Sequence, residues 1–188
     1  MHFITAMSFI AIALHSPLQE GYSTEWNKKS VLNTDGRVEF PGVVLAPGTY
    51  VIRLKESGEK RSIVEIRNQD ETQILANVLA IPDHRQRPDD NSEFVYFNAA
   101  TGQPQPVRTW FYSGYLIGLE FVYPKARAKE IAKASDDHVM ASNSNSEDAV
   151  IVAMTANGKE VVIDEPRPTS TARQKPTQGA NQTGCSPE

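Results

Sequence analysis

Closely spaced turn signals constrain this chain more than any other feature of its sequence. Pro41-Gly42 and Pro47-Gly48 each place a proline and a glycine at the centre of a four-residue turn. Proline fixes φ at the first central position and glycine accepts a positive φ at the second, as a type II turn requires. Because only Val43-Val44-Leu45 remains between the two turns, the strand that joins them must be very short.

Alternating apolar residues predict further strands between the turns. Tyr50, Ile52 and Leu54 recur at every second position, the period of a strand with one buried face. The segment from Thr72 to Ile81 is apolar on both faces, and its length and flanking turns favour a central strand over a helix. A polar loop is expected from Pro82 to Asn91. Other short strands are expected at residues 64–67, 94–97, 107–112 and 119–123.

A single helix is expected after these strands. The segment from Lys125 to Ala134 (KARAKEIAKA) consists of good helix formers, and Pro124 can occupy its first turn. Its apolar residues are mainly alanines plus Ile131, so we expect the helix to pack lightly on the sheet. The polar residues from Ser135 to Asp148 are interpreted as a linker.

The C-terminal part of the chain predicts a hairpin followed by a tail. Val150-Ile151-Val152 and Val161-Val162-Ile163 flank Asn157-Gly158, a strong hairpin dipeptide. From Asp164 onward Pro, Thr, Gln, Ser and Gly replace the large apolar residues, and no core can be built from them. The predicted organisation is a signal peptide (1–23), a β-sandwich-like domain (24–134), a linker with a β-hairpin (135–163) and a disordered tail (164–188).

The spacing of these segments predicts the fold class. About seven to nine short strands, roughly ten residues apart and accompanied by one short helix, are typical of an antiparallel β-sandwich or open barrel. The chain has 188 residues, which is enough for one domain with a real core and too few for two large ones.

The first residues predict export. The apolar run from Phe3 to Leu14 is too short to span a bilayer and fits the central region of a signal peptide. Gly21-Tyr22-Ser23 places small residues where a signal peptidase cleaves, so the mature chain is expected to start near Thr24. Met1-His2 lacks the usual Lys or Arg, and a buried strand or helix is the alternative. We expect a periplasmic or extracellular protein without a transmembrane anchor after signal removal.

Charge and cysteine content argue against several classes of function. The formal net charge is -4 and both signs are mixed along the chain, without the basic stripe that binding to nucleic acid requires. The single cysteine, Cys185, cannot close an internal disulfide or form a multi-cysteine metal cluster.

No motif for catalysis or for a cofactor stands out. His84 and His138 each neighbour aspartates, but without a close ligand spacing such as H-E-x-x-H they are interpreted as solvated loop residues. There is no G-x-S-x-G elbow, and Gly42 and Gly48 precede strands rather than a phosphate-binding helix. We therefore expect no cofactor and no metal.

Several sequence motifs carry a family resemblance. They are Glu25-Trp26-Asn27-Lys28-Lys29, the segment 41–51 (PGVVLAPGTYV), Leu79-Ala80-Ile81-Pro82, Trp110-Phe111-Tyr112 and the segment 120–128 (EFVYPKARA). Through these motifs the chain resembles, from Glu25 to Ala134, a group of uncharacterised exported bacterial β-domain proteins; it differs at Ser113, where proline is usual. The resemblance implies export and a compact β domain, and nothing catalytic.

Aromatic residues cluster near the end of the predicted β domain. On a strand, Arg108, Trp110 and Tyr112 share one face, with Phe111 on the other, and Glu120 is expected to be a partly buried partner of Arg108. Flat rings beside charged hydrogen-bonding groups are typical of sugar- and peptide-binding faces. The alternative is that these rings fill the core and pair across strands. Arg108, Trp110, Tyr112 and Glu120 are the candidate binding residues.

The sequence favours a non-catalytic extracytoplasmic binding or structural module, with envelope polysaccharide or protein as its partner and no oligomeric state specified. The alternative is a hydrolase acting on envelope polysaccharide or peptide. Two carboxyl groups facing one pocket, at least one with a strongly shifted pKa, would favour the hydrolase. A third hypothesis is assembly through an exposed edge strand.

Overall fold

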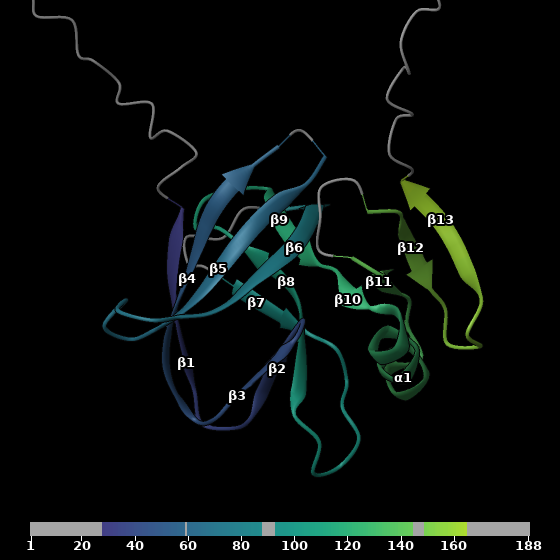
Figure 1. Ribbon diagram of the computed structural model, residues 1–188, viewed down its shortest axis with the longest axis horizontal. Helices are drawn as coiled ribbons and strands as arrows, with labels where there is room; N and C mark the ends of the chain where they lie inside the picture. Colours follow the sequence, from purple (N-terminus) through teal and green to yellow (C-terminus); the bar gives the residue numbers. More distant parts are fainter. Residues whose placement is uncertain (1–27, 59, 88–92, 145–148, 165–188) are drawn as a thin grey trace, which may run out of the picture.

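The computed structural model describes residues 28–58, 60–87, 93–144 and 149–164. Within these ranges the chain is mainly β, with thirteen strands and one helix (Figure 1). The predicted signal peptide, the tail after Asp164 and Cys185 lie outside them. The strands are β1 (Lys29–Thr34), β2 (Val38–Phe40), β3 (Val43–Leu45), β4 (Gly48–Ser57), β5 (Ser62–Asn68), β6 (Ile74–His84), β7 (Glu93–Tyr96), β8 (Gln105–Phe111), β9 (Ile117–Phe121), β10 (Tyr123–Pro124), β11 (Val139–Ser142), β12 (Ile151–Met154) and β13 (Glu160–Asp164), and the helix is α1 (Lys125–Ser135).

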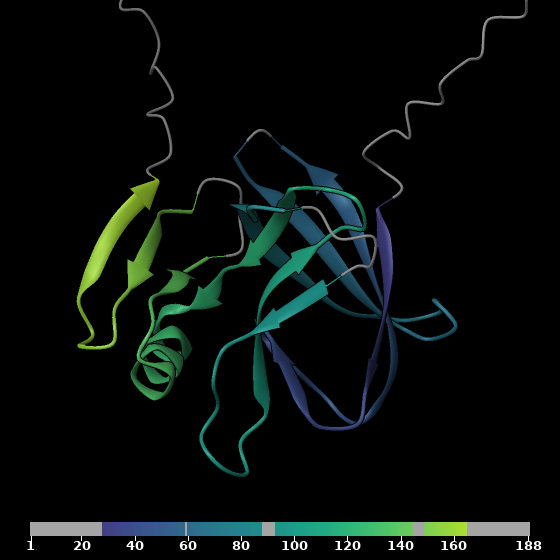
Figure 2. The same cartoon turned by 180° about the vertical axis from the view of Figure 1, so that it is seen from behind.

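The first nine strands form one sheet. Its order is β1-β4-β5-β6-β9-β8-β2-β3, with β7 paired to β8. The pairings are antiparallel except for the parallel contact of β2 with β8. The sheet curls into an open barrel, with the other strands and α1 along one side (Figures 1 and 2). The predicted mainly β fold with one short helix is therefore confirmed.

Side chains at alternate positions fill the barrel. On β4, Ile52 and Leu54 are buried and Tyr50 packs against the same cluster, as the period-two pattern predicts. Full burial of one such aliphatic side chain stabilises the fold by about 1.5–3 kcal/mol, so the shared interior outweighs any single surface contact. The largest fully buried residues of this cluster include Phe40, Ile66, Trp110, Phe121 and Tyr123.

Strand β6 is central and buried on both faces. Val78 and Ala80 point into the barrel, whereas Leu79 belongs to a second apolar cluster outside it. The prediction that a loop begins at Pro82 is wrong, because β6 continues to His84 and pairs with β9 over these residues. β5 pairs with β6 only as far as Ala80. Beyond that point one edge of β6 is without a ladder partner among the described strands, and a proline costs little there.

The two Pro-Gly turns differ. Gly42 joins β2 to β3 with φ +83°, as predicted. Gly48 does not have a positive φ; it is already the first residue of β4 and pairs with Thr34 on β1. The prediction of a second type II turn is therefore wrong. Its reason is the pairing with β1, which holds Gly48 in the extended conformation of β4.

Strands β10 to β13 form a second, four-stranded sheet in that order. The predicted linker is wrong, because β11 lies inside it, between β10 and β12, and all four of its residues are buried. A run of four residues in polar surroundings is too short for a local pattern to reveal. The predicted hairpin is confirmed as β12 and β13, and Gly158 in its turn has φ +79°.

The second sheet and α1 are packed onto the barrel. α1 begins after Pro124, as predicted, and buries Ala128, Ile131 and Ala132. These residues belong to the same apolar cluster as the barrel interior. On the other face, Ile151 and its neighbours on β11 and β12 pack against Leu79 of β6. No helix of the described residues is long and apolar enough to cross a membrane.

Candidate functional site

Trp110, one of the four candidate binding residues, is buried in the barrel. Its exposed fraction is 0%. The indole Nε1–H donates a hydrogen bond to Ser30 Oγ at 2.9 Å, and the ring makes an edge contact with Tyr112 at a centroid distance of 4.7 Å. A ring enclosed in this way cannot stack on an external ligand, so for Trp110 the core interpretation applies.

A β-bulge turns Arg108 away from Trp110. The register of β7 against β8 shifts here, and Arg108 is the extra residue on β8. Its Nε donates to Glu120 Oε1 at 3.2 Å and its Nη1 to Asp137 Oδ2 at 2.6 Å. Glu120 lies on the outer face of β9, opposite the interior that holds Trp110. The expected common face of Arg108, Trp110 and Tyr112 is therefore wrong, whereas the expected pairing of Arg108 with Glu120 is confirmed.

Glu120 has a strongly shifted pKa. Burial raises the pKa of Glu120 to about 7; the charge of Arg108 opposes that rise, and the carboxylate of Asp83 adds to it. Asp83 in turn accepts a hydrogen bond from Thr109 Oγ1 at 2.9 Å. This is one part of what the hydrolase hypothesis requires. The other part, a shared pocket, is not met here, because Glu120 is only 5% exposed and does not line the cavity described next.

A cavity of about 390 Å³ opens at one end of the barrel, where β1 and β9 begin and β4 and β6 end. We call it the barrel-end pocket. Ligand sites are typically concave, largely apolar and about 300–1,000 Å³ in volume. This pocket therefore has the size of a small-molecule site. Its lining residues are Lys28, Leu54, Ser57, Gly58, Ser62, Pro82, His84, Tyr112, Ile117 and Leu119.

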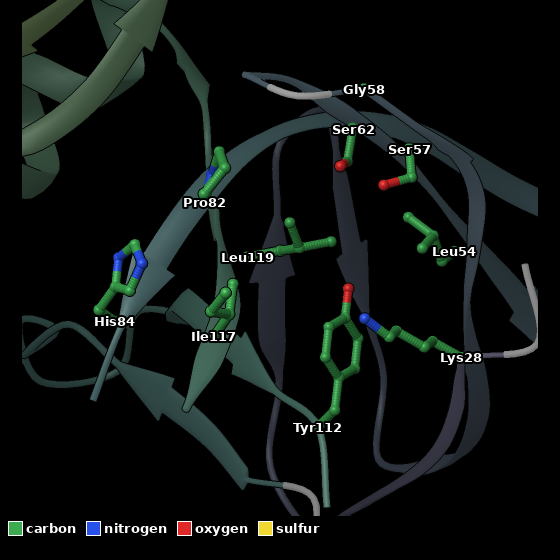
Figure 3. Close-up of a pocket in the computed structure, with 10 residues that line it drawn as sticks. All are labelled: Lys28, Leu54, Ser57, Gly58, Ser62, Pro82, His84, Tyr112, Ile117 and Leu119. Atoms are coloured by element: carbon green, nitrogen blue, oxygen red, sulfur yellow. The ribbon is translucent and has the colours of Figure 1, made fainter. Parts of the chain in front are cut away.

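The two sides of the barrel-end pocket differ in chemistry (Figure 3). On one side Ser57, Ser62, Lys28 and the Tyr112 hydroxyl lie around the opening. Pro82 and Ile117 form the other side, with Leu119 buried at the centre, and the His84 imidazole is the one polar group drawn on this side. Such a cavity can bind a molecule that has one polar and one apolar part.

Lys28 is held in place at the pocket. Its carbonyl oxygen accepts a hydrogen bond from the Leu54 amide at 2.9 Å. Its ammonium Nζ lies 4.4 Å from the ring centroid of Tyr112 and 4.8 Å from that of Tyr115. An ammonium within about 6 Å of a ring face is attracted by the π electrons. The two tyrosines therefore position the positive charge at the pocket.

Arg85 stabilises the turn between β8 and β9, which borders the pocket. Its Nε donates to the Tyr115 carbonyl and its Nη2 to the Tyr112 carbonyl, both at 2.9 Å. Its backbone amide donates to the Leu116 carbonyl at the same distance. Three hydrogen bonds from one residue hold the rim of the pocket in one shape.

Tyr112 is the only one of the four candidate binding residues, all of which are described, that lines the barrel-end pocket. The others lie in the core or in the Arg108–Glu120–Asp137 cluster. Sequence reasoning missed the remaining lining residues because they come from five different strands or their flanks. The one lining residue that a sequence motif had singled out was Lys28, which lies in the motif Glu25-Trp26-Asn27-Lys28-Lys29.

The two histidines within the described residues, His84 and His138, belong to no metal-binding arrangement of those residues. His84 is exposed at the end of β6, and His138 Nδ1 lies 3.0 Å from Asp137 Oδ1. Within the described ranges, no group of three or more His, Cys, Asp or Glu side chains is arranged so that it could hold a metal ion.

The fold and the pocket together define an open β-barrel with a ligand-sized cavity at one end and a small αβ layer on its side. No protein-family model, curated protein or solved structure matches the chain.

Proposed function

We propose that this protein is a non-catalytic binding module that acts outside the cytoplasm and holds its ligand in the barrel-end pocket. The observation that carries the proposal is the cavity of about 390 Å³ with a polar and an apolar side. The open ends of small β-barrels commonly serve as ligand sites, because the strands fix the lining side chains on a rigid frame.

The pocket replaces the Arg108–Tyr112 face as the proposed contact site. Trp110 is enclosed, and the Arg108 side chain is held by Glu120 and Asp137, so the two side chains do not form a shared exposed face for a partner. Tyr112 retains a place in the proposal, because its side chain lines the pocket. An envelope component is the proposed partner, either a small molecule or the end of a polysaccharide or peptide chain.

Binding is favoured over hydrolysis by the composition of the pocket. A hydrolase of the proposed kind needs two carboxyl groups that face the substrate. None of the ten described residues that line the pocket is Asp or Glu. Glu120, with its raised pKa, is buried beside Arg108 and Asp137 instead.

The proposed location follows from the apolar run of residues 3–14 and the small residues at 21–23. Expression of the full chain in a bacterium, followed by intact mass measurement of the envelope and cytosolic fractions, tests it. We expect a mature chain that starts near Thr24, in the envelope fraction. A chain that retains Met1 and stays in the cytosol would contradict export without affecting the proposed binding.

Native mass spectrometry of protein incubated with an envelope extract tests binding. We expect a bound molecule that is lost from Ile117→Trp, because Ile117 is 48% exposed at the pocket and a larger ring narrows the opening. Val31→Trp is the matched control: Val31 is 55% exposed on β1 and does not line the pocket.

Two outcomes would count against the binding proposal. One is the absence of any bound molecule from wild-type protein. The other is equal retention by both tryptophan variants, which would place the ligand elsewhere on the molecule.

A further inference from the structure

We infer that the ligand of the barrel-end pocket is an anion that carries an apolar group: a carboxylate, phosphate or sulfonate joined to a hydrocarbon portion. This inference rests on the proposed function and specifies the chemical class of the ligand.

The polar groups of the pocket are suited to a negatively charged acceptor. Lys28 contributes an ammonium, Ser57, Ser62 and Tyr112 contribute hydroxyl groups, and His84 contributes an imidazole. Every one of these groups can donate a hydrogen bond. Among the ten described lining residues no carboxylate is present to repel an anion or to bind a cation. Hydrogen bonds between a charged donor and an anion are also stronger than those between neutral groups.

The opposite side of the pocket is suited to hydrocarbon. Leu119 is buried at the pocket, and Pro82 and Ile117 extend the apolar surface toward the opening (Figure 3). Covering such surface is favourable by about 25 cal/mol per Å² of apolar area removed from water. A purely polar anion would leave this wall uncovered.

The apolar wall continues outside the pocket along the turn between β8 and β9. Tyr115, Leu116 and Ile117 are consecutive and 44%, 46% and 48% exposed. The hydrogen bonds from Arg85 to the carbonyl oxygens of this turn hold the rim in place. A hydrocarbon chain too long for the cavity can therefore lie along this rim, which accounts for three large apolar side chains facing water beside a charged opening.

The position of Lys28 determines which part of the ligand lies where. The ammonium is on the side of the pocket with Ser57 and Ser62, and Ile117 is on the other side (Figure 3). The anionic group is thus expected beside Lys28 and Tyr112, and the hydrocarbon against Leu119 and the rim.

Titration calorimetry with a matched set of ten-carbon probes tests the inference. The probes are decanoate, decyl phosphate, decanol and decyltrimethylammonium, each below its micelle concentration, with acetate as the anion without hydrocarbon. We expect decanoate or decyl phosphate to bind at least about tenfold more tightly than decanol, a difference of about 1.4 kcal/mol. The cationic probe and acetate should bind more weakly still. The two anions distinguish a carboxylate from a phosphate head.

Adjacent lysines provide the matched variants. Lys28→Met should weaken decanoate binding by about tenfold or more and leave decanol binding unchanged. Lys29→Met removes the same charge one residue along, at a side chain that pairs with Glu71 and does not line the pocket, and should bind decanoate like wild type. Equal weakening by both variants would indicate nonspecific attraction and overturn the inference.

The wild-type comparison does not depend on either variant folding. Equal affinity for decanoate and decanol, or tighter binding of the cationic probe, would overturn the inferred ligand class. If none of the probes binds while the envelope extract still yields a molecule that Ile117→Trp loses, the inference fails and the proposed function stands. If neither the probes nor the extract yields a bound molecule, both fail.

Discussion

At the scale of single residues, Trp110 joins segments that are far apart in the chain. Its indole Nε1–H reaches Ser30, 80 positions earlier, on β1. Its ring stacks over Phe94 with an interplanar angle of 7° and makes an edge contact with Tyr112. The residue thus fills the barrel, satisfies its own polar group and supports the tyrosine that lines the pocket.

Truncation of Trp110 should therefore destabilise the fold. We expect Trp110→Ala to lower the free energy of unfolding by roughly 3–5 kcal/mol, because it leaves a large cavity. Urea unfolding followed by circular dichroism measures this. Ser30→Ala leaves the indole N–H without its acceptor and should lower the free energy of unfolding by about 1–3 kcal/mol. This milder variant provides the measurement if Trp110→Ala does not fold. Wild-type stability in both variants would show that the ring is not part of the core.

Position 118 requires glycine, because the neighbouring strand packs too closely to leave room for a side chain. A Cβ at this position would lie 2.5 Å from Phe111 Cδ1 and 2.7 Å from the Trp110 carbonyl oxygen. The carbonyl belongs to the paired strand and cannot move without disturbing the ladder. We expect Gly118→Ala to lower the melting temperature, with a loss of about 1–3 kcal/mol. Gly36→Ala is the control, because a Cβ at this position has no atom within 4 Å, and it should leave the melting temperature almost unchanged.

At the scale of elements, a partly buried charged cluster joins the barrel to the segment after α1. Arg108 on β8 bonds both to Glu120 on β9 and to Asp137, which follows α1. Asp83 on β6 completes the charged surroundings of Glu120. Burial is the main cause that opposes the ionisation of Glu120, two carboxylates add to it, and Arg108 favours ionisation. Because the net effect raises the pKa, the cluster makes stability depend on pH.

The raised pKa of Glu120 predicts the sign of that dependence. In the unfolded chain Glu120 loses its proton near pH 4.5, but in the folded protein it keeps the proton up to about pH 7. Its contribution to stability is therefore fully present below pH 4.5 and is lost as the pH rises to about 7. Over this range the contribution of Glu120 to the free energy of unfolding falls by on the order of 3 kcal/mol. Urea unfolding of wild type and Glu120→Gln from pH 4 to 8 should show the variant gaining relative stability across this window.

Glu65 provides a control with the opposite sign. Burial alone would raise the pKa of Glu65, but hydrogen bonds from Arg67 and Arg53 outweigh burial and lower it. Its stabilising contribution is present above pH 4.5 and is lost as the pH falls below that value. Glu65→Gln should therefore be least stable, relative to wild type, at neutral pH. A Glu120→Gln difference that is constant from pH 4 to 8 would contradict the assigned role of Glu120.

At the scale of the whole molecule, the barrel and the side layer share their apolar interior. One buried cluster extends from Ile52 in the barrel to Ile131 on α1 and Val152 on β12. A second cluster joins Leu79 on the outer face of β6 to Ile151 on β12. The two parts are therefore expected to unfold together.

A core substitution in the side layer tests this cooperativity. Ile151 is fully buried against the barrel, and Ile151→Ala should lower the free energy of unfolding by about 2–5 kcal/mol. In a Trp26→Phe background the fluorescence reports Trp110 alone, since the chain has two tryptophans. We expect the Trp110 transition to shift with the circular dichroism transition. An unshifted Trp110 transition would mean that the side layer unfolds independently.

Local sequence patterns predicted much of the fold, for reasons visible at single elements. Tyr50, Ile52 and Leu54 alternate because β4 has one face in the barrel, and α1 forms where helix formers follow Pro124. The two-sided apolar pattern of β6 anticipated its central place. Four-residue β11 was missed, because its burial comes from partners on β10 and β12 rather than from its own periodicity.

The sequence by itself determined most of the strand pattern, the helix and the pairing of Arg108 with Glu120, since period, helix propensity and opposite charge are properties of neighbouring residues or simple pairs. Only the tertiary structure decided that a bulge separates Arg108 from Trp110, and that Lys28, Ser62, His84 and Tyr112 meet at one end of the barrel. The physical reason is strand register: which residues meet depends on pairings between segments tens of positions apart, and a shift of one residue reverses the face on which a side chain lies.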